Sequence, residues 1–434
     1  MITLNVFSRI RQLMSFKREQ TPGKVDLNGS GVMQVEMKYT DPIKEYELAE
    51  LRSHGNGLSA TAALNHEERT QIREFAREEV WTRSPFLSGM TEKYSDTIIG
   101  KTGPRIHITN APVGVDVAKV NRDWRAWVKA TKLTRKLKTL LSGEVVDGEG
   151  FLYMFFNPKV ANKSTVPLDV SNIECDQMER HDINFDDDNG SGGIVYDEYG
   201  NPVAYPMLKD HPGDVFKPIQ YDNYEFVPER YIVHLYREDR AGQKRGVSQY
   251  LQCLPLAALL RRFTLAAVKS AETHANHTGV LEADLPYAED EDGHETKAPS
   301  PYAAEGGKPW QQWWKKKQIS AGGLLLLPEG LKMKPFTSNH SSDFGAFRRS
   351  LQMEAANCIS MPYTMAANDI SKVSFASAMA GNLPWETKRD SVRTHLEDDC
   401  LEKIANMWLA IYMATVYMID VDLLEEPIEY EWFW

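Results

Sequence analysis

The chain has 434 residues, of which 42% are hydrophobic and 26% are charged. Its length predicts about two or three domains, and its sixteen Phe, eighteen Tyr and ten Trp exclude a compositionally disordered chain. Lys and Arg total 50 and Asp and Glu total 61, so the formal net charge is −11. This charge argues against a protein whose main role is to grip nucleic acid, because such domains are usually basic. It does not exclude a protein past which nucleic acid slides.

The cysteines and the apolar segments indicate a reducing compartment and no membrane span. Cys175, Cys253, Cys358 and Cys400 are far apart and form no CxxC pair, which predicts neither a disulfide framework nor a zinc site. The N-terminal segment lacks the apolar run and small-residue cleavage site of a signal peptide. The most apolar stretch, Ile404–Ile419, is shorter than the roughly 20 residues that cross a bilayer. We therefore expect a buried helix there.

Helical and strand patterns alternate in the first half of the chain. After a mixed, turn-rich segment, a charged amphipathic helix is predicted over His66–Arg83. A second helix is predicted over Arg122–Ser142, where apolar residues recur at three- and four-residue spacing. Strands bounded by turn signals are predicted at Gly148–Phe156, Ile194–Tyr196, Val203–Leu208 and Tyr231–Tyr236.

A long helix-forming run and a non-helical insert follow. The run extends from Gly246 to about His277, and Pro255 within it predicts either the true helix start or a kink. Thr278–Pro335 is not helical in pattern. It contains the acidic run Glu289–Asp292, then Pro and Gly punctuation, and it ends with a short strand and a turn.

The last third of the chain is mainly helical in pattern. A helix is predicted to restart at Phe344, with Ser342 or Asp343 as N-cap, and to end at Pro362. The small, polar residues of Met361–Asn382 predict a loop. A long helix is then predicted from about Trp385 to Met418, and the final IEYEWFW has the pattern of a strand. The apolar face of that helix contains Val392, Leu396, Cys400, Ile404, Trp408 and Ile411.

Common catalytic motifs are absent from the sequence. Ile99-Gly-Lys-Thr102 resembles the end of a phosphate-binding P-loop, but Ser95 stands where the first glycine is needed. A turn is the better prediction there. GxSxG, HExxH and GxGxxG do not occur. A catalytic centre assembled from distant residues stays open, but a non-catalytic protein is favoured.

The sequence predicts no metal site and no cofactor. Asp186–Asp188 could suggest calcium, but Gly190 falls at the fifth position, where an EF-hand needs an oxygen ligand. A solvated turn is the better interpretation. His274 and His277 have helical spacing, but no third ligand lies near them in the sequence. They are expected to be polar positions at a helix end.

The run WQQWWKKK is the sharpest local feature of the sequence. Aromatic anchors surrounded by charge are typical of protein-binding hot spots, and they also stack on single-stranded nucleic acid. Alternatively, the tryptophans pack inward and the lysines form a solvated face. These three interpretations concern Trp310, Trp313, Trp314, Lys315, Lys316 and Lys317.

Several segments together carry a family resemblance. In Val227–Leu251, a strand that reaches His234 leads through an Arg-containing turn to Gln243, Arg245 and Gly246, and so into a long helix. This pattern is similar to the lambda-like family of tailed-phage portal proteins, and the resemblance extends in order from His66 to the C-terminus. The other segments that carry it are Leu133–Phe156, Asp197–Asp214, Leu327–Phe336 and Ile359–Asn382.

The resemblance implies an α+β portal fold. Portals of this kind have a mixed α/β wing, a stem of two helices, and a clip inserted between those helices. The implied parts are an N-terminal wing at 1–245, a first stem helix at 246–277, a clip at 278–340, a second stem helix at 341–360, a tunnel loop at 361–382, and a returning wing helix with the start of a C-terminal part at 383–434. Family members normally continue further, so the resemblance also implies a truncated or incomplete C-terminal part.

The implied function is that of a homo-oligomeric ring, usually a dodecamer, at one capsid vertex of the virion. Double-stranded DNA passes through its channel. The terminase large subunit docks during packaging, and head-tail connector or adaptor proteins replace it later. The capsid protein surrounds the ring, which is assembled in the host cytoplasm and contacts no membrane. No catalysis is implied.

The resemblance also implies two sets of functional residues. The acidic balance fits a channel wall, because each Lys or Arg that neutralises a phosphate adds affinity for DNA. In the tunnel loop, a serine-rich segment is expected to contact DNA, although residues Val373–Ser377 depart from the family's sequence pattern. The predicted DNA-facing residues are Asn368, Asp369, Lys372, Ser374 and Ser377, and the predicted clip contacts to terminase or a neighbouring subunit are Trp310, Trp313, Trp314 and Lys315, Lys316 and Lys317.

Two other classes of protein stay open from the sequence. One is a ring-forming connector or adaptor without a DNA-facing loop. The other is a metal-dependent nuclease that uses scattered carboxylates such as Asp186–Asp188 and Glu289–Asp292. Both carboxylate runs fall in turn-rich segments, which preorganise metal ligands poorly.

Overall fold

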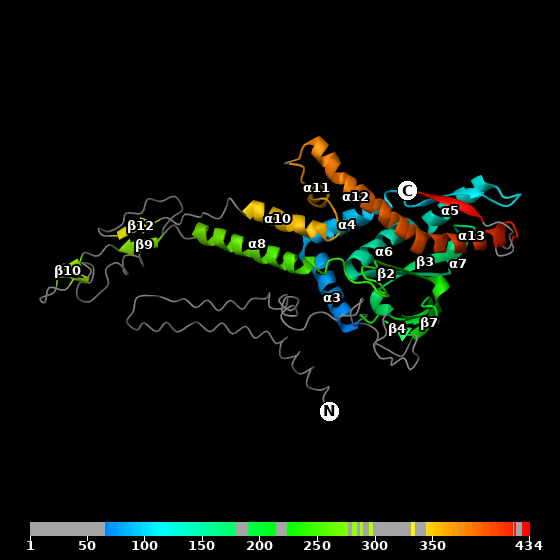
Figure 1. The fold of residues 1–434 in the computed structure, drawn as a ribbon, viewed down its shortest axis with the longest axis horizontal. Coiled ribbons are helices and arrows are strands. Elements are labelled where there is room, and N and C mark those ends of the chain that lie inside the picture. Colours follow the sequence, from blue (N-terminus) through cyan, green and yellow to red (C-terminus); the bar gives the residue numbers. More distant parts are fainter. Residues whose placement is uncertain are drawn as a thin grey trace, which may run out of the picture. The chain divides into compact units, whose positions relative to one another are not determined.

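The computed structural model describes part of the chain, all of it within Ile43–Trp434. The described residues are 66–178, 190–213, 224–276, 280–283, 287–289, 295–297, 331–334, 344–371, 373–419, 421 and 428–434. Figure 1 labels their helices and strands.

Two helices joined by a π-helical turn begin the described chain. Helix α3 (His66–Glu78) continues into the π-helical turn η3 (Glu79–Arg83). The helix predicted over His66–Arg83 is therefore confirmed. Helix α4 (Pro85–Ile99) starts with Pro at its first position, and the Ser84 hydroxyl accepts a hydrogen bond from the Leu87 amide at 3.4 Å. Gly100 ends α4 with φ 70°, so the segment that resembled a P-loop end is a turn, as predicted.

The helix predicted over Arg122–Ser142 is two helices, which corrects the prediction of one. Helix α5 (Val117–Thr131) and helix α6 (Leu133–Asp147) are separated by Lys132, whose φ is 56°. A left-handed residue cannot continue an α-helix. Apolar residues recur at helical spacing on both sides of Lys132, so the spacing alone did not indicate this break. The buried residues include Trp124, Trp127, Leu133, Leu137, Leu140 and Leu141.

Two antiparallel sheets pack beside these helices, and the predicted strands are confirmed. In the three-stranded sheet, β2 (Glu149–Phe156) lies between β3 (Leu168–Ile173) and β8 (Ile232–Tyr236). Helix α6 leads directly into β2 and contacts both β2 and β3. The four-stranded sheet has the order β4 (Gly190–Ser191), β5 (Ile194–Tyr196), β6 (Pro202–Leu208) and β7 (Tyr224–Pro228).

The first long helix after the sheets starts later than predicted. Helix α8 (Cys253–Asn276) begins at residue 253, not 246, and Pro255 lies in its first turn, where proline is tolerated. The preceding segment makes other hydrogen bonds, because the Gln249 amide donates to the Val145 carbonyl at 3.0 Å. Gly246 crosses Gly148 so closely that a side-chain carbon at Gly246 would collide with the Gly148 carbonyl oxygen.

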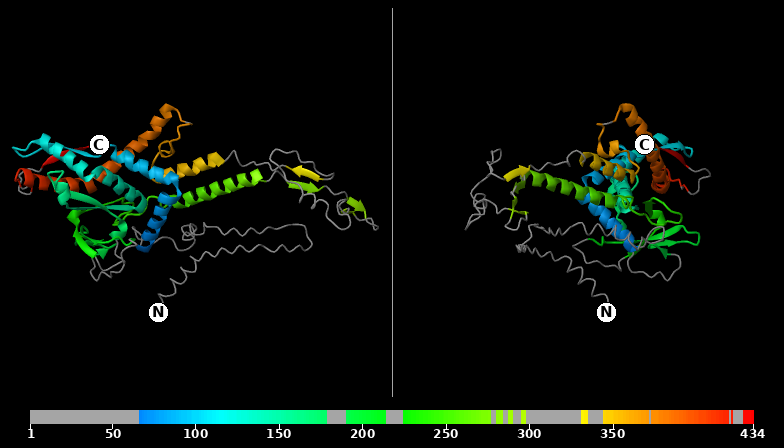
Figure 2. Two further views of the ribbon diagram at one scale, coloured as in Figure 1. Left: turned by 180° about the vertical axis from the view of Figure 1, so that it is seen from behind. Right: turned by 60° about the vertical axis from the view of Figure 1, so that its left-hand side comes forward.

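Helix α10 (Phe344–Asn357) returns beside α8 as an antiparallel partner (Figures 1 and 2). The Phe263 ring lies 5.3 Å from that of Phe344 and 4.5 Å from that of Phe347. The described residues between the two helices contain no helix, as predicted. They form two strand pairs, β9 (Val280–Ala283) with β12 (Leu331–Lys334) and β10 (Tyr287–Glu289) with β11 (Glu295–Lys297).

The segment 361–382, predicted to be a loop, is largely helical, which corrects that prediction. It contains α11 (Tyr363–Ala367) and the first turns of α12 (Phe375–Leu396). Ser374 caps α12, and alanines at 376, 378 and 380 favour helix. Pro384, within the helix, does not end it. The long helix therefore starts at Phe375, ten residues before the predicted start near Trp385.

The long helix continues through a π-helical turn, η6 (Glu397–Leu401), into α13 (Glu402–Val416). Its predicted apolar face is confirmed, since Leu396, Cys400, Ile404 and Trp408 are fully buried. No helix in the described ranges has the length and apolarity needed to cross a membrane.

The end of the chain forms the strand that its pattern predicts. Strand β13 (Glu429–Phe433) pairs antiparallel with β1 (Arg105–Asn110). This pairing covers a tryptophan cluster in which Trp124 lies 5.1 Å from Trp408 and 6.1 Å from Trp432. The main hydrophobic core therefore includes residues of α5, α13 and the strand pair.

Candidate functional site

The turn between α11 and α12 brings together most of the residues predicted to face DNA. Asn368 ends α11 in the left-handed conformation, with φ 54°, which Asn adopts more readily than most residues. Asn368, Ser374 and Ser377 are exposed, and Asp369 is half-buried. Lys372 lies outside the described residues.

Asp369 is held by its neighbours and does not project as a bare charge. Its carboxylate accepts hydrogen bonds from the Ser371 hydroxyl at 2.5 Å and the Ser371 amide at 3.1 Å. The Arg349 guanidinium, on α10, lies 3.3 Å from the same carboxylate. The Ser371 bonds, helped by Arg349, hold the pKa of Asp369 below its usual value. The negative charge at this turn is thus partly compensated.

Ser374 and Ser377 stabilise the start of α12. The Ser374 hydroxyl accepts a hydrogen bond from the Ser377 amide at 3.3 Å, and the two hydroxyl oxygens lie 2.9 Å apart. N-cap serines of this kind satisfy helix amides that otherwise lack a partner. Both side chains are exposed, so the cap also presents hydroxyl groups to whatever lies outside the turn.

Helix α4 anchors this turn to the rest of the fold. The Lys93 ammonium donates to the Ala366 carbonyl at 2.8 Å, and the Tyr94 and Trp385 rings meet edge to face at 5.7 Å. On the α10 side, the Arg349 guanidinium lies 5.0 Å above the Tyr363 ring. The sequence analysis missed Lys93 and Arg349, because neither belongs to a local motif.

Trp310, Trp313, Trp314 and the three lysines at 315–317 lie outside the described residues, as do Asp186–Asp188 and His277.

The α8–α10 pair presents apolar side chains to its surroundings. Leu265 is 51% exposed, Val268 49% and Phe347 47%. Leu259 and Met353 are exposed to a similar extent. Large apolar groups on neighbouring helices often mark a protein-binding surface.

A buried carboxylate joins the sheet to the segment that enters α8. Glu149, at the start of β2, is fully buried and accepts hydrogen bonds from Arg245 Nε at 2.8 Å and the Gly246 amide at 3.2 Å. His234 Nε2, on β8, lies 3.1 Å from the same carboxylate. Arg245 also donates to the Gly192 carbonyl. The family resemblance included Arg245 and Gly246, and their contacts give these residues a physical role.

The electrostatics of this network follow from its burial and its charges. Burial alone would raise the pKa of Glu149, but attraction to Arg245 and the hydrogen bonds from Arg245 and His234 hold it well below its usual value. Burial lowers the pKa of His234, and the bond with Glu149 opposes this only in part. The network is therefore an ionised Arg–Glu pair beside a histidine whose neutral form is favoured.

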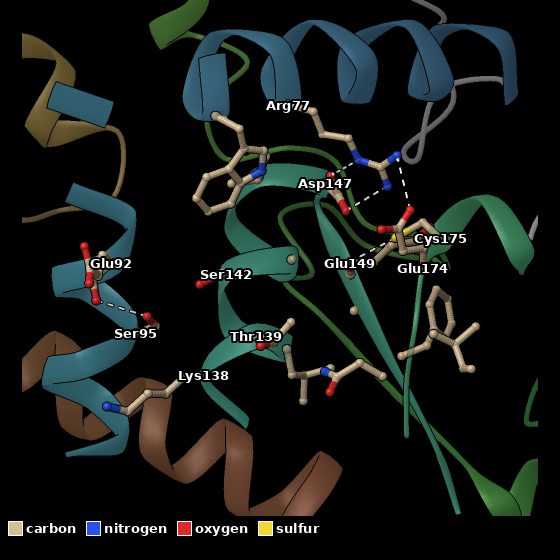
Figure 3. Close-up of a pocket in the computed structure, with 18 of the residues that line it drawn as sticks. Arg77, Glu92, Ser95, Lys138, Thr139, Ser142, Asp147, Glu149, Glu174 and Cys175 are labelled. Carbon is tan, nitrogen blue, oxygen red and sulfur yellow. Dashed lines mark hydrogen bonds and ion pairs between the residues drawn. The ribbon is translucent and has the colours of Figure 1, made fainter. Parts of the chain in front are cut away.

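A groove with a volume of about 660 Å³ lies between α4, α6 and the start of β2 (Figure 3). Arg77 crosses its upper part and binds Asp147 at 2.7 Å. Cys175 also lines it, but burial raises the pKa of the Cys175 thiol well above its ordinary value, and this thiol donates to the Glu149 carbonyl at 3.1 Å. The Cys175 thiol is therefore not an activated nucleophile of the kind that covalent catalysis needs.

Three groups beside this groove have the composition of a metal site. Glu174, Asp176 and His211 each offer a ligand atom within 4.8 Å of the others. However, Asp176 already binds Arg73 and Arg77, each at 2.6 Å, and His211 lies 2.7 Å from Glu174. The two guanidinium groups disfavour a bound cation, so the cluster is an ion-pair network. The sequence analysis did not identify it, since His211 lies far from Glu174 and Asp176 in the chain.

The comparison with protein families decides the class of this protein. The model for the lambda family of phage portal proteins matches residues 50–390, which is well over half of the 434 residues. The chain belongs to this family. Portal proteins are structural components of the capsid, not enzymes, so the nuclease alternative is removed.

Individual relatives are more distant. A stretch of 222 residues is 24% identical to a probable portal protein of Halomonas phage phiHAP-1, and it covers 51% of this chain and 41% of that protein. The match therefore spans less than half the length of that portal protein.

Several solved structures contain similar chains. A chain in the neck of the native gene transfer agent particle, computed with C12 symmetry, has a TM-score of 0.46 and 12% identity over 83% of this chain and 86% of that chain. A chain in the neck of the empty particle, computed with C6 symmetry, has a TM-score of 0.49 and 13% identity over 83% of each chain. An HK97 family phage portal protein from Corynebacterium diphtheriae has a TM-score of 0.31 and 12% identity over 75% of this chain and 85% of that chain.

Proposed function

We propose that copies of this portal protein form a ring, most simply a dodecamer, at one vertex of the capsid, and that double-stranded DNA passes through its channel. The observation that carries this proposal is the family match over residues 50–390. That span includes the α8–α10 pair, the α11–α12 turn and α4, which anchors the turn. The ring would be assembled in the host cytoplasm and remain in the virion.

The α8–α10 pair supports a ring of identical chains. Leu265 and Val268 on α8 and Phe347 on α10 are all about half exposed. Contact with the same helices of a neighbouring copy would bury these side chains, and removal of apolar surface from water favours association. We therefore assign the helix pair to the contact between neighbouring subunits.

The α11–α12 turn supports a surface that DNA passes without binding tightly. Asn368, Ser374 and Ser377 expose amide and hydroxyl groups, while the charge of Asp369 is partly compensated by Arg349. Uncharged hydrogen-bonding groups contact phosphates without releasing counterions, so they add less affinity than Lys or Arg would. We propose that these residues, together with Lys372, line the channel.

A charge change at the cap tests this role without removing the cap. Asp is as good an N-cap as Ser, so Ser374→Asp keeps α12 capped and adds a negative charge to the turn. If the turn lines the channel, rings of Ser374→Asp/Ser377→Asp should package less DNA, measured as protected genome per particle. Ser391→Asp, at an exposed position further along α12, is the matched control. Equal packaging by both variants would contradict a DNA-facing turn.

Ring formation has its own test. Electron micrographs of the purified protein along the ring axis count the subunits and reveal a channel. A ring with a long stem supports a portal, whereas a ring without a stem or axial loop supports the alternative of a connector or adaptor protein.

We further propose that the terminase large subunit, and later the head-tail connector proteins, dock on the insert between α8 and α10. The support is the sequence pattern of Trp310, Trp313, Trp314 and Lys315–Lys317. Rings with these three lysines changed to Glu should retain less terminase in a pull-down. Unchanged retention would contradict docking at this run.

A further inference from the structure

Two cysteines that are far apart in the sequence meet at the base of the α8–α10 pair. Cys253 is the first residue of α8, and Cys358 directly follows the last residue of α10. The helices are antiparallel, and Phe263 lies against Phe347. Ten residues back along α8 and eleven residues on along α10, the same register pairs Cys253 with Cys358.

The two thiols are in contact in this register. The Cys253 thiol is fully buried and forms a hydrogen bond with the Cys358 thiol. Cys358 is half-buried and packs against the same hydrophobic core. Cys358 is therefore the more exposed cysteine of the pair, and Cys253 is the buried one. Both are free cysteines.

We infer that Cys253 and Cys358 form a modification site at which a small disulfide, such as oxidised glutathione, produces an intramolecular disulfide bond. The Cys358 thiolate attacks one sulfur of the reagent, its S–S bond breaks, and one glutathione thiolate leaves. Cys253 then loses its proton and attacks the Cys358 sulfur of the mixed disulfide. The second glutathione leaves as a thiolate. The two cysteines lose two electrons and two protons, and one glutathione disulfide becomes two glutathione thiols.

The environment favours this order of steps. The hydrogen bond from Cys253 holds the pKa of the Cys358 thiol below its ordinary value, while the same bond and burial raise that of Cys253. Thiolates are the attacking species in disulfide exchange. Cys358, the more exposed cysteine of the pair, is thus also the one that ionises more readily. Cys175 and Cys400 are fully buried, and burial raises the pKa of each thiol.

The disulfide would covalently join the first residue of α8 to the residue that follows α10. A crosslink between residues far apart in sequence restricts the unfolded chain and thereby stabilises the folded one. It would clamp the helix pair at its base while leaving the insert between the helices unaltered. This inference does not depend on the proposed channel function, because it concerns the chemistry of one chain.

Thiol counting in the full chain tests the inference. After incubation of the folded, reduced protein with oxidised glutathione, the wild type should lose two of its four free thiols, counted in denaturant. Tryptic mass spectrometry should then find a peptide pair linked through Cys253 and Cys358. Cys175→Ser and Cys400→Ser are matched controls and should still lose two thiols.

Cys358→Ser should lose no thiol on oxidation. Because Cys358 is only half-buried, this variant disturbs folding less than a change at the fully buried Cys253. Four intact thiols in the oxidised wild type would overturn the inference. So would a stable mixed disulfide at Cys358 that Cys253 does not resolve, or a crosslink through Cys175 or Cys400.

Discussion

The buried core around Glu149 and the α8–α10 pair differ in which side chains they expose to solvent. In the core, a carboxylate and a guanidinium are withdrawn from solvent, with Glu149 0% and Arg245 1% exposed, and each has hydrogen-bond partners within the chain. On the helix pair, large apolar groups such as Leu265 and Phe347 remain about half exposed. The core is complete within one chain, whereas the helix pair leaves apolar surface for a partner.

This difference predicts two kinds of mutational effect, one on folding and one on association. A change in the core should affect folding of the single chain, because a buried charge without its partner is strongly unfavourable. A change on the outer face of the helix pair should leave the single chain folded and affect its association. The predictions below test that separation, from the largest expected effect to the smallest.

Glu149→Ala should have the largest effect. It leaves Arg245 buried without its carboxylate, and the loss of one partner of a buried ion pair costs about 3–5 kcal/mol. Urea unfolding of the single chain measures this loss. Arg389→Ala, which removes an ion pair near the surface with Asp390, is the control and should cost no more than about 1 kcal/mol. Similar losses for both variants would remove the distinction between the core and the surface.

Leu265→Asp should weaken assembly without unfolding the chain. A charge on the exposed face of α8 cannot be buried against a neighbour at low cost, so association should weaken at least about tenfold, or roughly 1.4 kcal/mol. Sedimentation measures assembly, and thermal unfolding measures the single chain.

Val113→Asp is the matched control for Leu265→Asp, because Val113 is fully exposed in the turn before α5. Normal assembly of Leu265→Asp, or equal weakening by both variants, would argue against the helix pair as the subunit contact.

His234 should make the core sensitive to acid. Its pKa in the folded chain is lowered by burial from the usual 6.5, so the unfolded chain takes up the proton first as the pH falls. Its contribution to stability is complete above about pH 6.5 and is lost below it, with a slope of at most about 1.4 kcal/mol per pH unit. His234→Gln should flatten unfolding free energies just below pH 6.5. His107→Gln, at an exposed position, is the control and should leave the slope unchanged. An unchanged slope in the His234 variant would exclude His234 as the source of the acid sensitivity.

Arg349→Ala should have the smallest effect. It removes a partly exposed ion pair with Asp369 and a contact with the Tyr363 ring, which together should be worth about 1 kcal/mol or less. Hydrogen exchange of the α11–α12 turn should nevertheless increase, because α10 no longer holds it. Arg348→Ala, at the exposed neighbouring position, serves as the comparison. A loss of several kcal/mol would mean that the turn belongs to the core.

The sequence predicted elements whose signal is local. Strands β2, β5, β6 and β8 and the buried face of α13 follow from alternation, helical spacing and turn residues. The break at Lys132 and the early start of α12 were missed, because apolar spacing runs through the first and a proline obscured the second. Pattern recognition fails where a single backbone conformation or a cap decides the outcome.

The site was less predictable than the fold. Asn368, Ser374 and Ser377 could be identified from the family resemblance, but the partners that hold their turn could not. Lys93 reaches a carbonyl 273 residues away in the chain, and Arg245 binds a carboxylate 96 residues away. Cys253 and Cys358 meet for the same reason. Such contacts depend on how helices and strands pack, which residue spacing in one sequence does not specify.

The crossing of Gly148 and Gly246 has a mechanical consequence. At this point the backbone leading into α8 lies directly on the backbone that starts β2, with no side chain between them. A push or pull along α8 would therefore be transmitted to the sheet by backbone contact, without the slack that a flexible side chain provides. The base of the long helix behaves as a stiff joint, so bending strain should concentrate further out along the helix pair.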